Sequence, residues 1–196
     1  KGKMLLQNSF YKKYIILTVD DGYIDNYTIL YTMLKKYNMK AVIFLVSGLD
    51  YNRWTVESDN EKRFDLMSDE EVMELQNSGH IEFGGHTLTH VSFFDVDDER
   101  AREEIVKDKE ITEKRLGKKL KVFAYPYGHK RKEVVEMVKE CGYSFAVSTD
   151  TGSGIFTKDL FDIRRTAIDK TSLINFLRRI SPRYLQYKAR KYKDKF

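Results

Sequence analysis

Thr18-Val19-Asp20-Asp21-Gly22-Tyr23 decides how the chain is interpreted, because an apolar run ends there in two adjacent carboxylates. Residues 15–17 before it predict a buried strand, and residues 27–37 after it predict a helix. The loop between a strand and a helix is where α/β folds place their chemistry. Neighbouring aspartates repel each other, so a cation that separates their roles would explain the pair. An ordinary Asp-Asp-Gly surface turn explains it equally well, and this stretch alone does not decide between the two.

Length and composition indicate one folded domain. A chain of 196 residues can bury a substantial core without disulfides, and we assign residues 1–181 to that domain and residues 182–196 to a basic tail. The one cysteine, Cys141, is interpreted as a small core side chain. No apolar run reaches the length of a membrane span and no secretory signal is visible. The chain does not begin with methionine, so the compartment stays open.

The net charge of +5 is concentrated at the end of the chain. Residues 182–196 hold the acidic Asp194 and the basic residues Arg183, Lys188, Arg190, Lys191, Lys193 and Lys195. The rest of the chain is neutral on balance, and we expect no nucleic-acid partner. A basic tail can make weak contact with an anionic membrane surface or a polyanion, although a solvated chain end is the more common explanation.

Strand-like and helix-like patterns alternate along the whole chain. Strands are expected at residues 15–17, 41–46, 81–84, 122–125, 145–148 and 161–168. Helices are expected at residues 27–37, 68–78, 97–116, 133–141 and 172–180. This order predicts a parallel sheet with helices outside it, but it does not distinguish an open sheet from a barrel.

Two of the expected helices carry clear local signals. Ser68 and Glu71 form the capping-box pattern that starts a helix. In the long charged helix, Ile105, Ile111 and Leu116 are expected to face the core.

Residues 47–65 are expected to form a long polar loop, and loops of this length are usually functional or mobile. Trp54 lies within it. Its ring is either a hydrophobic anchor for the loop or a platform for a ring-shaped ligand.

A polar cluster follows four of the expected strands. The clusters are Asp20-Asp21, His86 with His90, Tyr125-Pro126-Tyr127 and Ser148-Thr149-Asp150. The carboxyl ends of parallel strands meet at one edge, so we expect these side chains to gather on one face.

His86 and His90 are four residues apart, a spacing that on one turn of helix points both imidazoles at one cation. A metalloprotease helix with this spacing needs a glutamate after the first histidine, and Thr87 stands there. Two histidines and one aspartate supply three ligands and leave a fourth position for water, as hydrolytic zinc sites require. If one carboxylate of the Asp20-Asp21 pair is a ligand, the other is available as a base.

Three segments carry a resemblance to a known family. Thr18-Val19-Asp20-Asp21-Gly22, Gly85-His86-Thr87-Leu88-Thr89-His90 and Ala124-Tyr125-Pro126-Tyr127-Gly128 resemble, in order and separation, the first three motifs of the polysaccharide deacetylases, the NodB-homology or family 4 carbohydrate esterases. The resemblance implies a distorted (β/α) barrel of about seven parallel strands. It also implies a metal-dependent enzyme that removes acetyl groups from N-acetylhexosamine polymers, with the cell envelope or the extracellular space as the favoured location.

The resemblance further implies a role for each matching residue. Asp20 would be the general base, and Asp21, His86 and His90 would hold a divalent metal, most simply zinc, with cobalt, nickel or iron as alternatives. The backbone N–H of Tyr127 would help to hold the oxyanion. We also assign Tyr125, Pro126 and Trp54 to substrate binding.

Two positions depart from the family pattern. Ala124 stands where the third motif normally carries an arginine that orients the base, and no Leu-x-His histidine follows His129. A last strand would send Arg164 and Arg165 to opposite faces, and Arg165 is our candidate for the missing arginine. His129 is a candidate general acid, although a solvated loop histidine is the simpler interpretation.

Three functions remain open from the sequence. The first is N-deacetylation of an N-acetylated glycan. The second is the same metal chemistry on a small non-sugar amide, for which residues 47–65 would close a pocket rather than border a groove. The third is a catalytically inactive glycan-binding module, which the two departures suggest.

Overall fold

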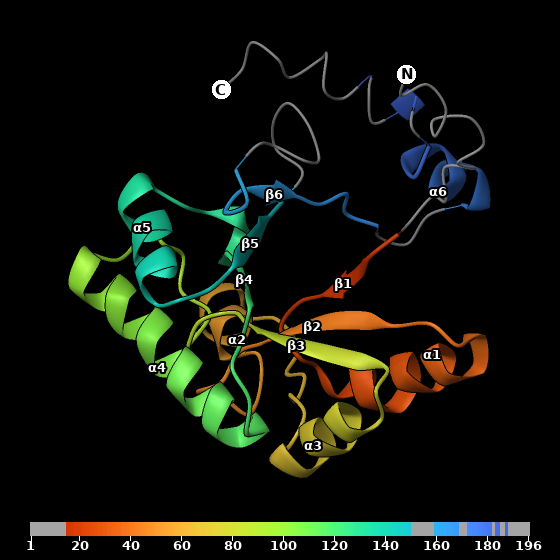
Figure 1. Cartoon of the computed structure of the whole chain (residues 1–196), viewed down its shortest axis with the longest axis horizontal. Helices are drawn as coiled ribbons and strands as arrows, with labels where there is room; N and C mark the ends of the chain where they lie inside the picture. The colour runs from red at the N-terminus through yellow and green to blue at the C-terminus, as the bar shows by residue number, and fades with distance from the viewer. Residues whose placement is uncertain (1–14, 150–158, 169–171, 182, 185–186, 188–196) are drawn as a thin grey trace, which may run out of the picture.

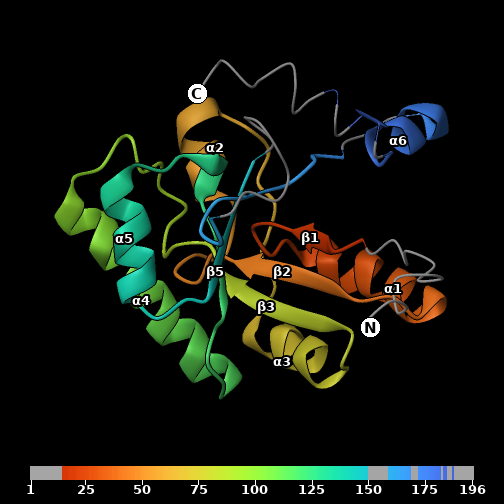
Figure 2. The same ribbon diagram turned by 45° about the horizontal axis from the view of Figure 1, so that its top comes forward.

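Six parallel strands form one curled sheet in the computed structural model, which describes residues 15–149, 159–168, 172–181, 183–184 and 187. The strands are β1 (Leu17–Val19), β2 (Ala41–Leu45), β3 (Ile81–Gly85), β4 (Val122–Ala124), β5 (Phe145–Ser148) and β6 (Ile163–Arg164). Each strand pairs with the next one in the chain. Figures 1 and 2 show the curl of the sheet, with α1, α3, α4 and α5 outside it. The predicted α/β barrel class is confirmed, with six strands in the described residues where about seven were expected.

The helices begin and end largely at the predicted signals. They are the π-helix η1 (Asn26–Leu30), α1 (Tyr31–Tyr37), α2 (Arg53–Asp59), α3 (Asp69–Asn77), α4 (Asp98–Leu116), the short 3₁₀ helix η2 (Pro126–Gly128), α5 (Lys132–Glu140) and α6 (Leu173–Arg179). The capping box of α3 is confirmed, because the Glu71 N–H donates to Ser68 Oγ at 3.3 Å and the Ser68 N–H donates to the Glu71 carboxylate at 2.8 Å. At the start of α4, the Arg100 N–H donates to the Asp97 carboxylate at 2.8 Å.

Alternation along the strands divides the core into two clusters. The larger one lies between the sheet and the helices and includes Ile43, Phe83 and Ile105. The smaller one contains Phe44, Ala124 and Val147. Each of these is next in the chain to a residue of the larger cluster, and because successive residues of a strand point to opposite faces, the smaller cluster faces the inside of the curl. Both faces of the central strands are thus buried, as expected for a parallel sheet.

The strand ends define where a site can form. All five strand pairs are parallel, so the loops after the strands share one rim of the curl. β1 and β6 are the edge strands, and in the described residues they pair with no further strand and not with each other. The described part of the sheet is therefore not closed into a full barrel by strand pairing.

Four sequence expectations were wrong in detail. The first strand spans Leu17–Val19 instead of residues 15–17, and Ile15 and Ile16 are 64% and 71% exposed. Residues 47–65 contain the helix α2 instead of a continuous loop, because the buried Asn52 side chain donates to Thr55 Oγ1 at 2.7 Å and accepts from the Phe64 N–H at 2.6 Å. Ile111 on α4 is 38% exposed and does not face the core. The last strand spans only Ile163–Arg164 within the predicted range 161–168.

The chain end lies mostly beyond the described residues. The predicted domain boundary at residue 181 and the contact of the 182–196 tail with a membrane or polyanion therefore stay predictions. Among the residues that the structure describes, none belongs to a helix that is both long and apolar enough to cross a membrane.

Candidate metal centre

The turn after β1 sends its two carboxylates in different directions. Asp21 and Gly22 both have left-handed backbones, with φ of +75° and +82°, and the Gly22 N–H donates to the Asp20 carbonyl at 3.0 Å. A Cβ at Gly22 would lie 2.7 Å from a methyl carbon of Leu45, so glycine is required by both conformation and space. This turn resolves the repulsion between the neighbouring aspartates, because each carboxylate meets a different partner.

His86 and His90 lie on the loop after β3, so the prediction that one turn of helix carries them was wrong. Thr87 and His90 adopt left-handed backbones with φ of +71° and +58°, which curl the loop enough to bring both imidazoles together. The loop is fixed by Glu104 of α4, whose carboxylate accepts from the Thr89 N–H at 2.8 Å and from Thr89 Oγ1 at 2.6 Å.

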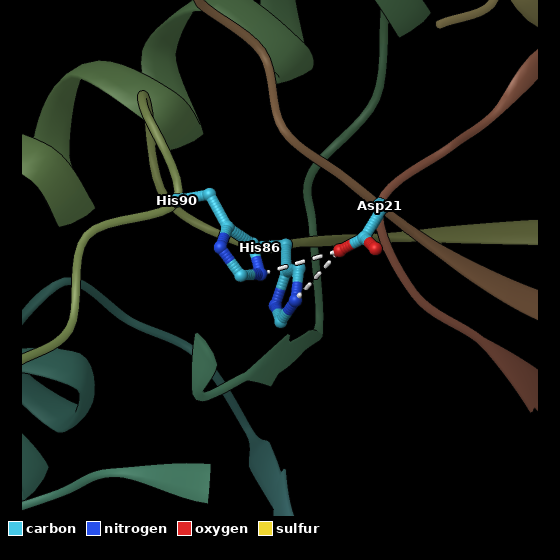
Figure 3. A group of neighbouring side chains, drawn as sticks. All are labelled: Asp21, His86 and His90. Atoms are coloured by element: carbon cyan, nitrogen blue, oxygen red, sulfur yellow. Dashed lines mark ion pairs between the residues drawn. The ribbon is translucent and has the colours of Figure 1, made fainter. Parts of the chain in front are cut away.

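The predicted ligands Asp21, His86 and His90 converge on one point (Figure 3). Asp21 Oδ1 lies 3.4 Å from His86 Nε2 and 3.3 Å from His90 Nε2. His86 Nδ1 lies 2.7 Å from the Ala124 carbonyl oxygen, which can only accept, so in the neutral ring Nε2 keeps its lone pair for a ligand. The arrangement is that of two imidazole nitrogens and one carboxylate oxygen around a cation.

Burial and charge at this point favour a cation. Asp21 Oδ1 is buried and receives no hydrogen bond, a costly state for an ionised oxygen unless a cation compensates it. Burial opposes ionisation of Asp21, but the contacts with His86 and His90 outweigh it and lower its pKa. Burial lowers the pKa of His90, whereas the two aspartates outweigh burial at His86 and raise its pKa. The donor set and the orphaned oxygen therefore fit a divalent metal.

Arg165 binds both oxygens of Asp20. Its Nη1 lies 2.6 Å from Oδ1 and its Nη2 lies 2.7 Å from Oδ2, while Nη1 also donates to Thr18 Oγ1 at 3.2 Å. The guanidinium lies over the Phe44 ring, 5.4 Å from its centre, and so enters the curl. Burial opposes ionisation of Asp20, but the hydrogen bonds from Arg165 lead the effects that lower its pKa. Arg164, in contrast, pairs with Asp162 at 3.0 Å.

Aromatic rings enclose the outer ligand, His90. The Trp54 ring stacks on it with centres 4.4 Å apart and an angle of 25°, and the Tyr127 ring meets it edge-on at 4.7 Å and 76°. Trp54 is supplied by α2, and Tyr127 by the η2 turn, where its φ of +58° is again left-handed. Trp54 therefore contacts a candidate metal ligand. The sequence analysis considered it as an anchor for its loop or as a platform for a ligand, but not in contact with a metal ligand.

The assignment of Tyr125 and Pro126 to substrate binding stays a prediction, which the positions of their side chains do not favour. Both are buried, and the Tyr125 hydroxyl donates to the Phe161 carbonyl at 3.1 Å within the core. They support the turn that presents Tyr127. His129 Nδ1 lies 3.0 Å from Ser92 Oγ, and its role as an acid stays a prediction.

Sequence reasoning missed two buried acids on α4. Glu104 and Asp108 are both fully buried, and burial raises the pKa of Asp108 to about 7. A Cβ on Gly85 would lie 2.4 Å from Asp108 Oδ2, so glycine at the end of β3 makes room for this carboxyl beneath the histidine loop. The sequence did hold a signal for them. Glu104 and Asp108 are four residues apart, and they lie on the same side of α4 as the apolar, core-facing Ala101 and Ile105.

The fold and the site together define a parallel α/β barrel protein with a hydrolase-type candidate metal centre at the rim of its strands. Residues 7–146 match the sequence profile of the family described as polysaccharide deacetylase. The chain therefore belongs to the polysaccharide deacetylase family.

Individual relatives agree with this assignment. A poly-β-1,6-N-acetyl-D-glucosamine N-deacetylase of Staphylococcus aureus (strain MSSA476) is 28% identical over 152 residues, which cover 74% of this chain and 50% of the relative. The Streptococcus pyogenes deacetylase PplD, solved in complex with acetate, has a TM-score of 0.73 and 25% identity, over 87% of this chain and 72% of that one. BC0361, a polysaccharide deacetylase from Bacillus cereus, has a TM-score of 0.69 and 27% identity, over 85% and 51% of the two chains. The chain spans about half the length of the curated relatives it matches.

Proposed function

We propose that the protein is a metal-dependent hydrolase that removes N-acetyl groups from an N-acetylhexosamine-containing poly- or oligosaccharide. The separation of two adjacent carboxylates carries this proposal, because Asp20 is paired with Arg165 while Asp21 lies between His86 and His90. The Staphylococcus aureus relatives are named for a polymer of N-acetylglucosamine, which supports the substrate class.

Asp21, His86 and His90 would hold the cation. Zinc suits two imidazoles and one carboxylate, and cobalt, nickel or iron are the alternatives. When bound, the metal would polarise an amide carbonyl and lower the pKa of water at the site. Trp54 and Tyr127 shield the His90 ring on two sides, which limits the access of bulk water to this ligand.

Asp20 is the proposed general base. Arg165 holds both of its oxygens and so fixes the direction of the carboxylate, which is ionised at neutral pH and can accept a proton from the attacking water. The departing amine needs a proton when the C–N bond breaks. Asp20 can return the one it accepted, so a single carboxylate can act first as base and then as acid. His129 is the alternative acid.

Tyr127 is the proposed oxyanion donor. Amide hydrolysis places negative charge on the former carbonyl oxygen, and a fixed backbone N–H stabilises that charge without reorganising. The left-handed conformation of Tyr127 sets the direction of its N–H, and the buried Pro126 before it keeps the turn rigid.

Acetate release tests this proposal. The protein loaded with zinc or cobalt is assayed on β-1,4- and β-1,6-linked N-acetylglucosamine oligomers, beside metal-free protein, Asp20→Asn and the remote exposed control Asp69→Asn. We expect Asp20→Asn to lower kcat by about 10²- to 10⁴-fold, the usual worth of general acid–base catalysis, and Asp69→Asn to leave it unchanged. Equal release by Asp20→Asn and the wild type would contradict the role of Asp20.

The same assay separates the two other candidate functions. Acetate release from small acetamides but from no glycan would favour a hydrolase of small non-sugar amides. Glycan binding without metal-stimulated release from any acetamide would favour an inactive binding module.

A further inference from the structure

A row of aromatic rings begins at His90, one of the candidate metal ligands. Tyr127 contacts the His90 ring, His129 lies beside Tyr127 with ring centres 5.5 Å apart, and Phe94 stacks on His129 at 4.5 Å and 26°. We call Tyr127, His129 and Phe94 the ring row. Its members come from two separate loops, the one after β3 and the one after β4, so their alignment is a product of the fold.

The ring row is exposed although two of its members are large aromatic side chains. Phe94 is 61% exposed and Tyr127 is 48% exposed, whereas the neighbouring Phe93 is fully buried. A single exposed aromatic residue needs no explanation, but a contiguous set in contact with a candidate metal ligand is unusual and marks a binding surface.

The loop that carries Phe94 is held in place without help from burial of the ring. The Phe94 N–H donates to Ser92 Oγ at 3.3 Å, and the same hydroxyl contacts His129 Nδ1 at 3.0 Å. Arg131 donates to the Phe93 carbonyl at 2.9 Å and to the Val96 carbonyl at 2.8 Å. The backbone that carries the exposed ring is thus held before any ligand arrives, and the ring itself stacks on His129, which lowers the entropy that binding costs.

We propose that the ring row, with Phe94 at its outer end, binds a sugar unit of the substrate other than the one that is deacetylated. This inference rests on the proposed function. The face of an aromatic ring is electronegative and attracts the polarised C–H groups on the flat side of a pyranose. The row runs from His90 through Tyr127 and His129 to Phe94, so a chain whose acetamide lies at the metal centre would place its neighbouring units along these rings.

Binding measured without turnover tests the inference. Zinc-loaded Asp20→Asn protein is titrated calorimetrically with N-acetylglucosamine and with its β-1,4- and β-1,6-linked tetramers. The same titrations are made with three double variants, in which the Asp20→Asn protein also carries Phe94→Ala, Phe94→Tyr or Phe145→Ala. Phe145 is a matched control, because it is 41% exposed and begins β5, at the end of the strand away from the site.

We expect at least one tetramer to bind more tightly than the monomer. Phe94→Ala should weaken that tetramer about tenfold, which corresponds to ~1.4 kcal/mol, and should leave the monomer unchanged. Phe94→Tyr should restore binding, and Phe145→Ala should have no effect. Equal affinity of the tetramer for Phe94→Ala and its parent would overturn the inference, as would an equal loss for monomer and tetramer.

Acetate release by otherwise wild-type protein separates failure of this inference from failure of the proposed function. If wild-type protein releases no acetate but the tetramer still depends on Phe94, the ring row stands as a glycan site and the proposed hydrolysis fails. If acetate is released from the tetramer with the same kcat/KM in wild type and Phe94→Ala, the hydrolysis stands and the ring row fails.

Discussion

Arg165 and Asp20 join the two edges of the sheet, because the guanidinium that follows β6 grips both oxygens of the carboxylate that follows β1, at 2.6 and 2.7 Å. The described parts of β1 and β6 do not pair with each other, so this ion pair connects them at the rim. Ala124 on β4 stands where the family pattern has an arginine, and its methyl group cannot bind a carboxylate. Arg165, which follows the last strand, makes the contact with Asp20 in this chain. The proposed base is held at the rim by a residue 145 positions away in the chain.

Replacing Arg165 by lysine should lower kcat by about tenfold or more. Lysine keeps the positive charge but cannot hold two carboxylate oxygens at once, so Asp20 would lose its fixed direction. Arg164→Lys is the matched control, because the adjacent arginine pairs with Asp162, two residues before it in the chain. Steady-state kinetics on an N-acetylglucosamine oligomer measure the effect, and similar kcat values for the two variants would argue against an orienting role for Arg165.

Trp54 should act as a support for His90 more than as a surface for substrate. His86 is oriented by a hydrogen bond to Ala124, whereas His90 Nδ1 is buried without a partner and depends on ring contacts. Trp54→Ala should therefore weaken zinc binding by about 10-fold, in the range of other contacts that orient metal ligands, and Trp54→Phe should preserve most of the affinity. Competition against a chromophoric chelator measures it.

The protein carries its own reporter for this contact. Trp54 is the one tryptophan in the chain, so its fluorescence comes from the ring stacked on His90. Cobalt or nickel should quench it on binding. A loss of glycan affinity in Trp54→Ala at unchanged zinc affinity would instead assign Trp54 to the substrate.

How much of the site was predictable depends on how local each signal is. Asp20 and Asp21 were found because they directly follow an apolar run, and His86 and His90 because they are two histidines four residues apart after a predicted strand. The histidine loop was mistaken for a helical turn because the left-handed conformation of Thr87 is imposed by its surroundings and leaves no pattern in the sequence.

The long-range parts of the structure were harder to predict. The α2 helix depends on the buried Asn52, whose side chain accepts a hydrogen bond from the Phe64 N–H twelve residues away. The polar composition of residues 47–65 does not reveal this contact and therefore suggested a loop. Arg165 could be proposed because one of two adjacent arginines on a strand must face inward. The contact between Phe94 and His129 joins two loops, and no feature of either segment predicts it.

Glu104 should be essential for folding of the histidine loop. Its carboxylate is fully buried and binds Thr89 and Arg100, the latter at 2.6 Å. Glu104→Gln removes the charge of a buried carboxylate that accepts hydrogen bonds from Thr89 and Arg100, and should lower the free energy of unfolding by about 2 kcal/mol. The neighbouring Glu103→Gln weakens more exposed pairs with Arg100 and Lys107 and should cost less than about 1 kcal/mol. Urea unfolding at pH 7 compares them, and equal losses would contradict the special position of Glu104.

Glu113 should make part of the stability dependent on pH. Burial opposes its ionisation, but contacts from Lys109, Lys119 and the Leu120 N–H outweigh it and lower its pKa to about 2, from 4.5. A carboxyl with a lowered folded-state pKa stabilises the protein above its unfolded value, and this contribution is lost as the pH falls from about 4.5 towards 2. Glu113→Gln should therefore reduce the free energy of unfolding by about 1.5 kcal/mol at pH 7, and the difference from the wild type should shrink at pH 3. Urea unfolding at the two pH values measures it.

Glu110→Gln on the same helix is the control. A Glu113→Gln difference that persists unchanged at pH 3 would show that the carboxylate charge of Glu113 does not stabilise the fold.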